Sequence, residues 1–133
     1  MNARSVNTLI VGGYALAFHA KPRFTKDIDL LVEPTAENAE RLLHALRDFG
    51  FGDLDLSIED FTTPNRVVQL GVAPNRVDLM TAIDGVSFAE AWAGRASGRF
   101  GETPVSYLGK AELIRNKRAS GRAQDLADLE ILG

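Results

Sequence analysis

The sequence predicts a single domain of the α/β (α+β) class, residues 1–133, with helices packed on a small β-sheet. Three observations support this class. Short β-rich runs alternate along the chain with segments of helical spacing. The 133 residues are enough to bury one hydrophobic core, and too few for a second. With 45% hydrophobic and 25% charged residues, the composition is typical of a soluble globular protein.

The strands are expected where apolar or alternating runs end at turn residues. They cover residues 8–11, 27–32, 66–72, 76–83 and a short strand or hairpin near 100–105. The first is an apolar run that stops at Gly12 and Gly13, as a buried strand before a tight turn does. Ala73, Pro74 and Asn75 separate the third and fourth runs, which predicts a hairpin.

The helices are expected where helical spacing is bounded by capping residues. They cover residues 14–19, 35–50 and 88–93, with two further pieces inside 110–132 that break near Gly121. Thr35 is expected as the N-cap of the second helix. Ser87 and Glu90 form a capping-box pattern for the third. Residues 53–63 have a weak, acidic pattern and are expected to be irregular.

The last helix carries two alternating sets of residues. The acidic set is Asp125, Asp128 and Glu130, and the apolar set is Leu126, Leu129 and Leu132. This alternation is typical of an amphipathic helix docked on the rest of the domain, so we expect its role to be mainly architectural.

Composition and charge exclude several classes of function. The formal net charge of −3 is unfavourable for a broadly basic nucleic-acid surface. The chain has no cysteine, which excludes disulfides, thiolate zinc sites and a cysteine nucleophile, so any metal must be held by oxygen or histidine nitrogen. No segment approaches the roughly 20 apolar residues that span a bilayer, and the first residues lack a secretory pattern. We therefore expect a cytoplasmic protein without membrane contact.

Gly12 and Gly13 lie between the first strand and the first helix. A strand that runs through glycines into a helix presents free backbone N–H groups and the positive end of a helix dipole, which suits a phosphate. Glycine pairs after strands are more often ordinary turns, so this signal is weak when taken alone.

Three aspartates give a stronger signal when they are taken together. Strand alternation puts Asp27 and Asp29 on one face, with β-carbons roughly 7 Å apart, where two carboxylates can share a hard cation. Simple solvation, or a salt bridge to Lys26, explains the pair without a metal. Asp78 interrupts the later run 76–83. If the two strands are neighbours, three carboxylates converge beside the glycine turn, as at sites that hold Mg²⁺ and a triphosphate.

Together these motifs resemble the nucleotidyltransferase superfamily of polymerase-beta type. Three segments carry the resemblance: GGYALAFHAKPRFTKDIDLLVEP, RVDLMTAI and LIRNKRASGRAQDLADLEIL. More narrowly, the chain is similar to the minimal bacterial proteins grouped with the AbiEii-type nucleotidyltransferase toxins, and the resemblance covers nearly all of it. It implies an α/β core with a mixed β-sheet, that is, a nucleotidyltransferase-like core.

The resemblance also implies roles for individual residues. Gly12 and Gly13 would hold the β- and γ-phosphates through backbone amides. Asp27 and Asp29 would ligate two metal ions, Mg²⁺ or Mn²⁺. Asp78 would bind the metal that activates the acceptor, and is a candidate to take its proton.

Basic residues are implied as contacts to the nucleotide. Lys117 and Arg122 match a late basic helix of the toxin-like relatives and would neutralise phosphate charge, with Asp125 as an orienting or structural partner. Lys26 would either steer the nucleotide or simply balance the nearby aspartates. Tyr14 stands where the superfamily usually has serine, and is expected to be either a helix-packing residue or a replacement ligand.

The function expected from the resemblance is metal-dependent transfer of a nucleoside monophosphate from a nucleoside triphosphate. The acceptor is an unidentified hydroxyl or phosphate of RNA, protein or a small molecule, and the protein is expected to belong to a toxin-antitoxin pair. The alternative is a catalytically inactive module that acts as an antitoxin-like or regulatory partner. A homodimer or a complex with a small partner protein is compatible with either. A purely structural role is disfavoured, because a strand face without a metal would gain from losing one of the repelling charges.

Overall fold

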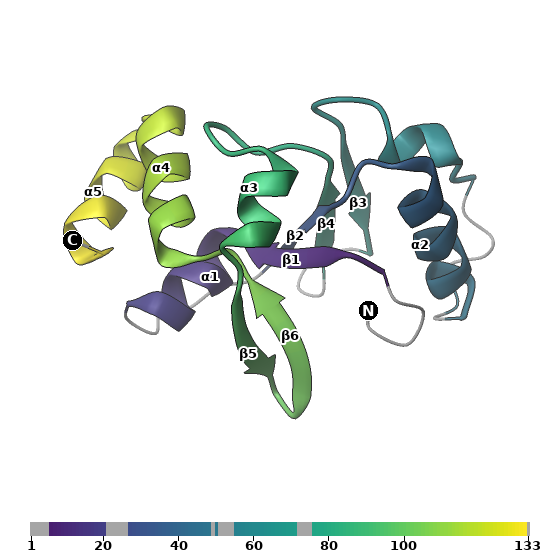
Figure 1. The fold of residues 1–133 in the computed structure, drawn as a ribbon, viewed down its shortest axis with the longest axis horizontal. Coiled ribbons are helices and arrows are strands. Elements are labelled where there is room, and N and C mark those ends of the chain that lie inside the picture. The colour runs from purple at the N-terminus through teal and green to yellow at the C-terminus, as the bar shows by residue number, and fades with distance from the viewer. Residues whose placement is uncertain (1–5, 21–26, 49, 51–54, 72–75, 133) are drawn as a thin grey trace.

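The computed structural model describes residues 6–20, 27–48, 50, 55–71 and 76–132. The strands are β1 Thr8–Val11, β2 Ile28–Val32, β3 Val67–Leu70, β4 Val77–Met80, β5 Ala96–Phe100 and β6 Thr103–Tyr107. The helices are α1 Gly12–His19, α2 Ala36–Asp48, the 3₁₀ segment η2 Ile58–Phe61, α3 Phe88–Ala93, α4 Lys110–Ser120 and α5 Ala123–Leu132. Figure 1 shows these elements around one sheet, which confirms the α/β class.

The six strands form one sheet in the order β3-β4-β2-β1-β6-β5. β1 is antiparallel to β2 and parallel to β6, whereas β2 is parallel to β4. β3 pairs with β4, and β5 with β6, as antiparallel neighbours. The sheet is therefore mixed, as the resemblance implied, and β2 and β4 are direct neighbours.

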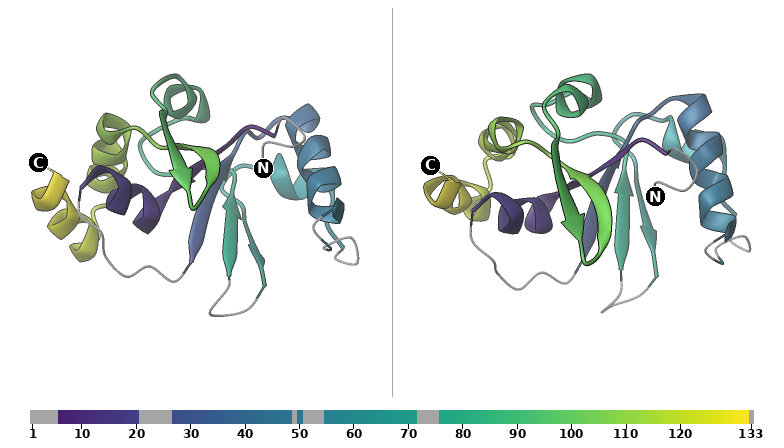
Figure 2. Two further views of the ribbon diagram at one scale, coloured as in Figure 1. Left: turned by 90° about the horizontal axis from the view of Figure 1, so that it is seen from below. Right: turned by 60° about the horizontal axis from the view of Figure 1, so that its bottom comes forward.

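Helices lie at both ends of the molecule. Figures 1 and 2 show α2 beside the β3–β4 end, α4 and α5 at the opposite end, and the β5–β6 hairpin projecting away from the body. One buried apolar cluster lies between α2 and the β2–β4 region, around Phe61, Leu42 and Leu79. The other joins β1 to α1, α3 and α4, around Leu9 and Leu113. The sheet is thus packed against helices at both ends.

Most element boundaries follow from local signals in the sequence. Thr35 Oγ1 accepts a hydrogen bond from the Asn38 N–H at 3.2 Å, which confirms Thr35 as the N-cap of α2. Ser87 and Glu90 exchange the two bonds of a capping box at α3. Gly121, with φ of +65°, ends α4 in the left-handed conformation that glycine adopts without strain.

Some boundaries differ from the expectation. α1 begins at Gly12, two residues earlier than expected, because the glycines themselves enter the helix. β2 begins at Ile28, so Asp27 lies just before the strand. Pro22 and residues 72–75 lie outside the described residues.

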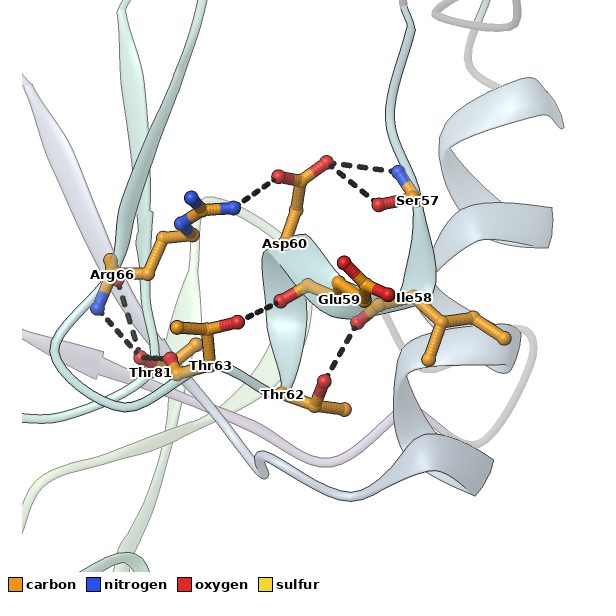
Figure 3. A network of polar contacts seen from close by, with 8 residues as sticks. All are labelled: Ser57, Ile58, Glu59, Asp60, Thr62, Thr63, Arg66 and Thr81. Atoms are coloured by element: carbon orange, nitrogen blue, oxygen red, sulfur yellow. Dashed lines mark hydrogen bonds and ion pairs between the residues drawn. The ribbon is translucent and has the colours of Figure 1, made fainter.

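The segment 53–63 was expected to be irregular, and its described part contains η2. Ser57 and Asp60 cap this short helix: Asp60 Oδ2 accepts from the Ser57 N–H at 2.9 Å. Arg66 donates from Nη1 to Asp60 Oδ1 at 2.6 Å (Figure 3). The prediction failed because a single polar turn has too few residues to show helical spacing.

Thr81 joins this turn to the end of β4. Its buried hydroxyl accepts from the Arg66 N–H at 2.9 Å and donates to the Thr63 carbonyl at 2.7 Å (Figure 3). The buried hydroxyl thereby finds partners in two backbone groups of the neighbouring turn. The contacts fix the end of β4, the strand that carries Asp78.

No helix in the described residues is both long and apolar enough to cross a membrane.

Candidate active site

Asp29 and Asp78 lie side by side in the sheet. They are Cα partners on the parallel neighbours β2 and β4, and Asp29 is also paired with Val11 at the end of β1. Both aspartates line a cavity of about 490 Å³. The remaining lining residues are Val11, Gly12, Val67, Met80, Ala82, Ile83, Asp84, Asn116, Lys117, Ser120 and Arg122. The cavity therefore has a carboxylate wall from the sheet and a second wall from α4 and the α4–α5 connection.

Gly12 lies directly against the carboxylate pair. A β-carbon at this position would collide with the Asp29 carboxylate, and the φ of +66° is one that other residues adopt only with strain. Gly12 also begins α1, whose first N–H groups have no intrahelical acceptor. The glycine thus lets the Asp29 carboxylate lie directly against the start of α1, where a cation held by the carboxylates would also be close to the helix terminus.

The carboxylate pair is electrostatically strained. Burial of Asp29, followed by the negative charges of Asp78 and Asp27 and a hydrogen bond with Asp78, raises the pKa of Asp29 from 3.8 to about 6. The positive charge of Arg76 opposes this increase only in part. Asp78 Oδ1 is buried and has no hydrogen-bond partner among the described residues. Near neutral pH, the pair holds negative charge that the surrounding residues compensate only in part.

Asp27 has a different environment from Asp29. Arg76 donates from Nη2 to Asp27 Oδ2 at 2.8 Å, and its Nε lies 3.4 Å from Asp78 Oδ1. The guanidinium therefore stands between the first and third aspartates of the predicted triad. We had not anticipated this role for Arg76. Arg76 precedes Asp78 by two residues as Asp27 precedes Asp29, but only the parallel register of β2 and β4 brings Arg76 and Asp27 together.

A hard divalent cation fits Asp29 and Asp78. Within the described part of the chain, no group of three or more histidine or acidic side chains is already arranged to hold a metal ion. The two carboxylates nevertheless offer only oxygen donors, one of them an unpartnered buried oxygen, and they repel each other until a cation compensates them. The site thus suits a cation that takes its other ligands from water or phosphate.

Arg122 lies on the opposite wall of the cavity. Its Nε donates to Asp125 Oδ2 at 2.7 Å, while most of the side chain remains exposed. The pKa of Arg122 is raised by this hydrogen bond and by the charge of Asp125, with smaller contributions from Asp84 and Asp29. Arg122 is therefore within electrostatic range of the carboxylate wall and still accessible to an anion in the cavity.

Lys117 lines the cavity but is buried in an ion-pair network. Its Nζ lies 3.2 Å from Asp125 Oδ1 and 3.0 Å from Asp128 Oδ2. Burial disfavours the Asp125 charge, but hydrogen bonds from Arg122, Ser120 and Lys117 outweigh it and hold the Asp125 pKa well below its usual range. Lys117 is thus joined to α5, and its charge is compensated by two buried carboxylates rather than directed to a phosphate.

This network corrects the expected orientation of α5. Asp125, Asp128 and Leu132 form the buried side of the helix, whereas Leu126 is 51% exposed and Glu130 is also exposed. An ordinary amphipathic helix would bury its leucines and expose its acids. Here the buried Lys117 reverses the preference, because an unpaired buried ammonium would cost more than the exposure of one leucine.

Other predicted nucleotide-binding residues lie elsewhere. The Tyr14 ring packs edge-on against Phe100 at 5.1 Å between centroids, and Tyr14 is not among the cavity-lining residues. Gly13 follows Gly12 in α1 and does not line the cavity either. Lys26 lies outside the described residues.

The comparison with known families shows to which family the chain belongs. Residues 6–93 match the model of the nucleotidyl transferase AbiEii toxin family, described as belonging to a type IV toxin-antitoxin system. The chain belongs to the AbiEii nucleotidyltransferase family. The match covers Gly12, Asp29 and Asp78 and ends at the last residue of α3. Lys117 and Arg122, on the opposite wall of the cavity, lie beyond the part that matches the AbiEii family. No curated protein matches the chain.

Proposed function

We propose that this chain transfers a nucleoside monophosphate from a nucleoside triphosphate to an acceptor hydroxyl or phosphate, in the cavity lined by Asp29, Asp78 and Arg122. The observation that carries the proposal is the pair of Asp29 and Asp78 on adjacent strands beside Gly12, in a chain of the AbiEii family. A carboxylate pair that repels itself in the free protein is suited to a partner that brings positive charge.

Mg²⁺ or Mn²⁺ is the metal that these residues would hold, and the ion would neutralise charge on the reacting phosphates. Asp29 and Asp78 supply the oxygen ligands, and Asp27 is the third candidate. The triphosphate would lie in the cavity beside Gly12 and the first N–H groups of α1, and Arg122 would balance its charge from the opposite wall.

The reaction forms one bond and breaks one bond at the α-phosphorus. The acceptor oxygen attacks this phosphorus, the bond to the bridging oxygen of the β-phosphate breaks, and pyrophosphate leaves. Asp78 is the proposed acceptor of the hydroxyl proton, because its Oδ1 has no other hydrogen-bond partner among the described residues. Catalysis by the chain consists mainly of positioning and charge balance.

Family membership supports a role as the toxin of a toxin-antitoxin pair, with an antitoxin as partner. An inactive binding module would need an obstacle to the triphosphate, and the candidate is Tyr14, which stands where the superfamily usually has serine. The packing of Tyr14 against Phe100 gives that alternative no support.

The test is a screen for transfer of α-labelled nucleotides, with each of the four nucleoside triphosphates, Mg²⁺ or Mn²⁺, and RNA or cell extract as acceptor. We expect label in a macromolecular or small-molecule product with the wild-type chain, and none with Asp29→Asn or Asp78→Asn. Transfer that survives in the Asp29→Asn, Asp78→Asn double variant would show that another site performs the reaction.

A further inference from the structure

Two unequal pairs of side chains lie across the parallel register of β2 and β4, one at the cavity and one just before the two strands begin. Asp29 lies opposite Asp78 in the parallel register, and Ile28 lies opposite Val77. Asp27 and Arg76 immediately precede Ile28 and Val77 in the two paired segments. The Ile28 N–H donates to the Arg76 carbonyl at 3.2 Å, which holds the two segments together. Asp27 and Arg76 are therefore an anion beside a cation, whereas Asp29 and Asp78 are two anions side by side.

Arg76 contacts both acidic neighbours of the Asp29 position but is fully satisfied by neither. Its Nη2 forms a short hydrogen bond to Asp27 Oδ2. Its Nε is near enough to Asp78 Oδ1 for an ion pair, yet both of these buried atoms have no hydrogen-bond partner among the described residues. The side chain of Arg76 is 36% exposed, so the guanidinium can move without opening the core.

A guanidinium and a divalent cation compete for the same carboxylate oxygens. A carboxylate in a charge-assisted hydrogen bond to arginine is already compensated, and a metal must replace that bond before it gains the oxygen as a ligand. Asp27 is compensated in this way, whereas Asp29 has no cationic hydrogen-bond donor among the described residues.

We propose that Arg76 is a positioning residue that competes with the divalent cation, holding Asp27 away from the metal until the guanidinium is displaced. The free protein then binds a cation through Asp29 and Asp78, and Asp27 becomes a ligand only when Arg76 releases it. This inference rests on the proposed function, because it assumes that the carboxylate site takes a divalent cation.

The test measures Mn²⁺ binding to the whole chain without nucleotide, from the electron paramagnetic resonance signal of free Mn²⁺. The variants are Arg76→Gln, Asp27→Asn and the two combined. Arg66→Gln is the matched control. Arg66 also pairs with an aspartate, Asp60, at 2.6 Å, but neither residue lines the cavity. Circular dichroism checks the fold of each variant. If Arg76→Gln does not fold, Arg76→Lys replaces it, because lysine keeps the positive charge but cannot contact Asp27 and Asp78 at once through a guanidinium.

We expect Arg76→Gln to bind Mn²⁺ roughly ten- to a hundredfold more tightly than the wild type, the range for loss of one hydrogen bond to a charged group. Arg76→Lys gives a smaller gain, and Arg66→Gln leaves the affinity unchanged. The Asp27→Asn change should cost several-fold more affinity in the Arg76→Gln background than in the wild type, because only there is Asp27 a ligand.

Two results would refute the competition between Arg76 and the cation and would leave the proposed function unaffected. One is an unchanged affinity in both Arg76 variants while the wild type binds Mn²⁺. The other is a gain in Arg76→Gln that persists undiminished with Asp27→Asn, since this would be a general charge effect. If no variant binds Mn²⁺ at millimolar concentration, the metal site itself is refuted, and the proposed function fails with it.

Discussion

The charge of Asp29 is predicted to destabilise the metal-free protein. Its pKa rises from 3.8 to about 6 through burial and the neighbouring carboxylates. Between these two values the folded state holds a proton that the unfolded state has lost, so stability falls as the pH rises through this window. At roughly 1.36 kcal/mol per pKa unit the full penalty is about 3 kcal/mol, which partial exposure and screening reduce to about 1–2 kcal/mol.

Asp29→Asn removes this penalty. We expect the variant to be about 1–2 kcal/mol more stable than the wild type at pH 7.5 in EDTA, with almost no difference near pH 2.5, well below the pKa of Asp29 in either state. The assay is urea unfolding followed by the fluorescence of Trp92. Asp55→Asn, which changes an exposed carboxylate, is the control and should show no such pH dependence. An Asp29→Asn variant that is equally or less stable at pH 7.5 would refute the electrostatic reasoning.

Three further substitutions test the supports of the site by urea unfolding. Thr81→Val leaves the Arg66 N–H and the Thr63 carbonyl without their partner, and should cost about 1–3 kcal/mol, whereas Thr62→Val removes only an exposed bond and should cost under about 0.5 kcal/mol. Gly12→Ala forces a β-carbon into the Asp29 carboxylate and should cost at least about 1 kcal/mol of unfolding free energy. Its control, Gly13→Ala at the next helical position, should be neutral or stabilising. Equal effects of the two substitutions would contradict the close approach of Gly12 to Asp29. Lys117→Met leaves the buried carboxylates of Asp125 and Asp128 without their ammonium partner and should cost about 3–5 kcal/mol of unfolding free energy. The control Lys110→Met changes an exposed lysine and should cost less than about 1 kcal/mol. An equally small loss for Lys117→Met would show that the Lys117 ion pairs do not stabilise the fold.

The fold could be predicted largely because its signals are local. Apolar runs, capping residues and glycines gave β1, α3 and the break between α4 and α5 at or near their observed positions. η2 was missed because one short polar turn shows no helical spacing, and because its bond from Arg66 to Asp60 comes from a residue outside the turn. The face of α5 was predicted wrongly for a related reason. Which side of a helix is buried depends on its neighbour, and here the neighbour is a buried lysine.

The candidate site was predictable only in part. Strand alternation and a guess about strand neighbours were enough to bring Asp29 and Asp78 together. The pairing of Asp27 with Arg76 depends on the parallel register of β2 and β4, which no short motif specifies. The opposite wall requires α4 and α5 to fold back over the sheet, so Asn116 and Ser120 gave no signal as lining residues.

The central claim is that Asp29 and Asp78 together hold a divalent cation beside the nucleotide. Its most direct test is an anomalous difference map from crystals grown with Mn²⁺ and a non-hydrolysable nucleoside triphosphate. The account predicts a manganese peak within about 2.0–2.6 Å of oxygens from both carboxylates, in contact with the phosphates and beside Gly12. A nucleotide bound in this cavity with no metal at either carboxylate, or a manganese peak at a different group of residues, would contradict it.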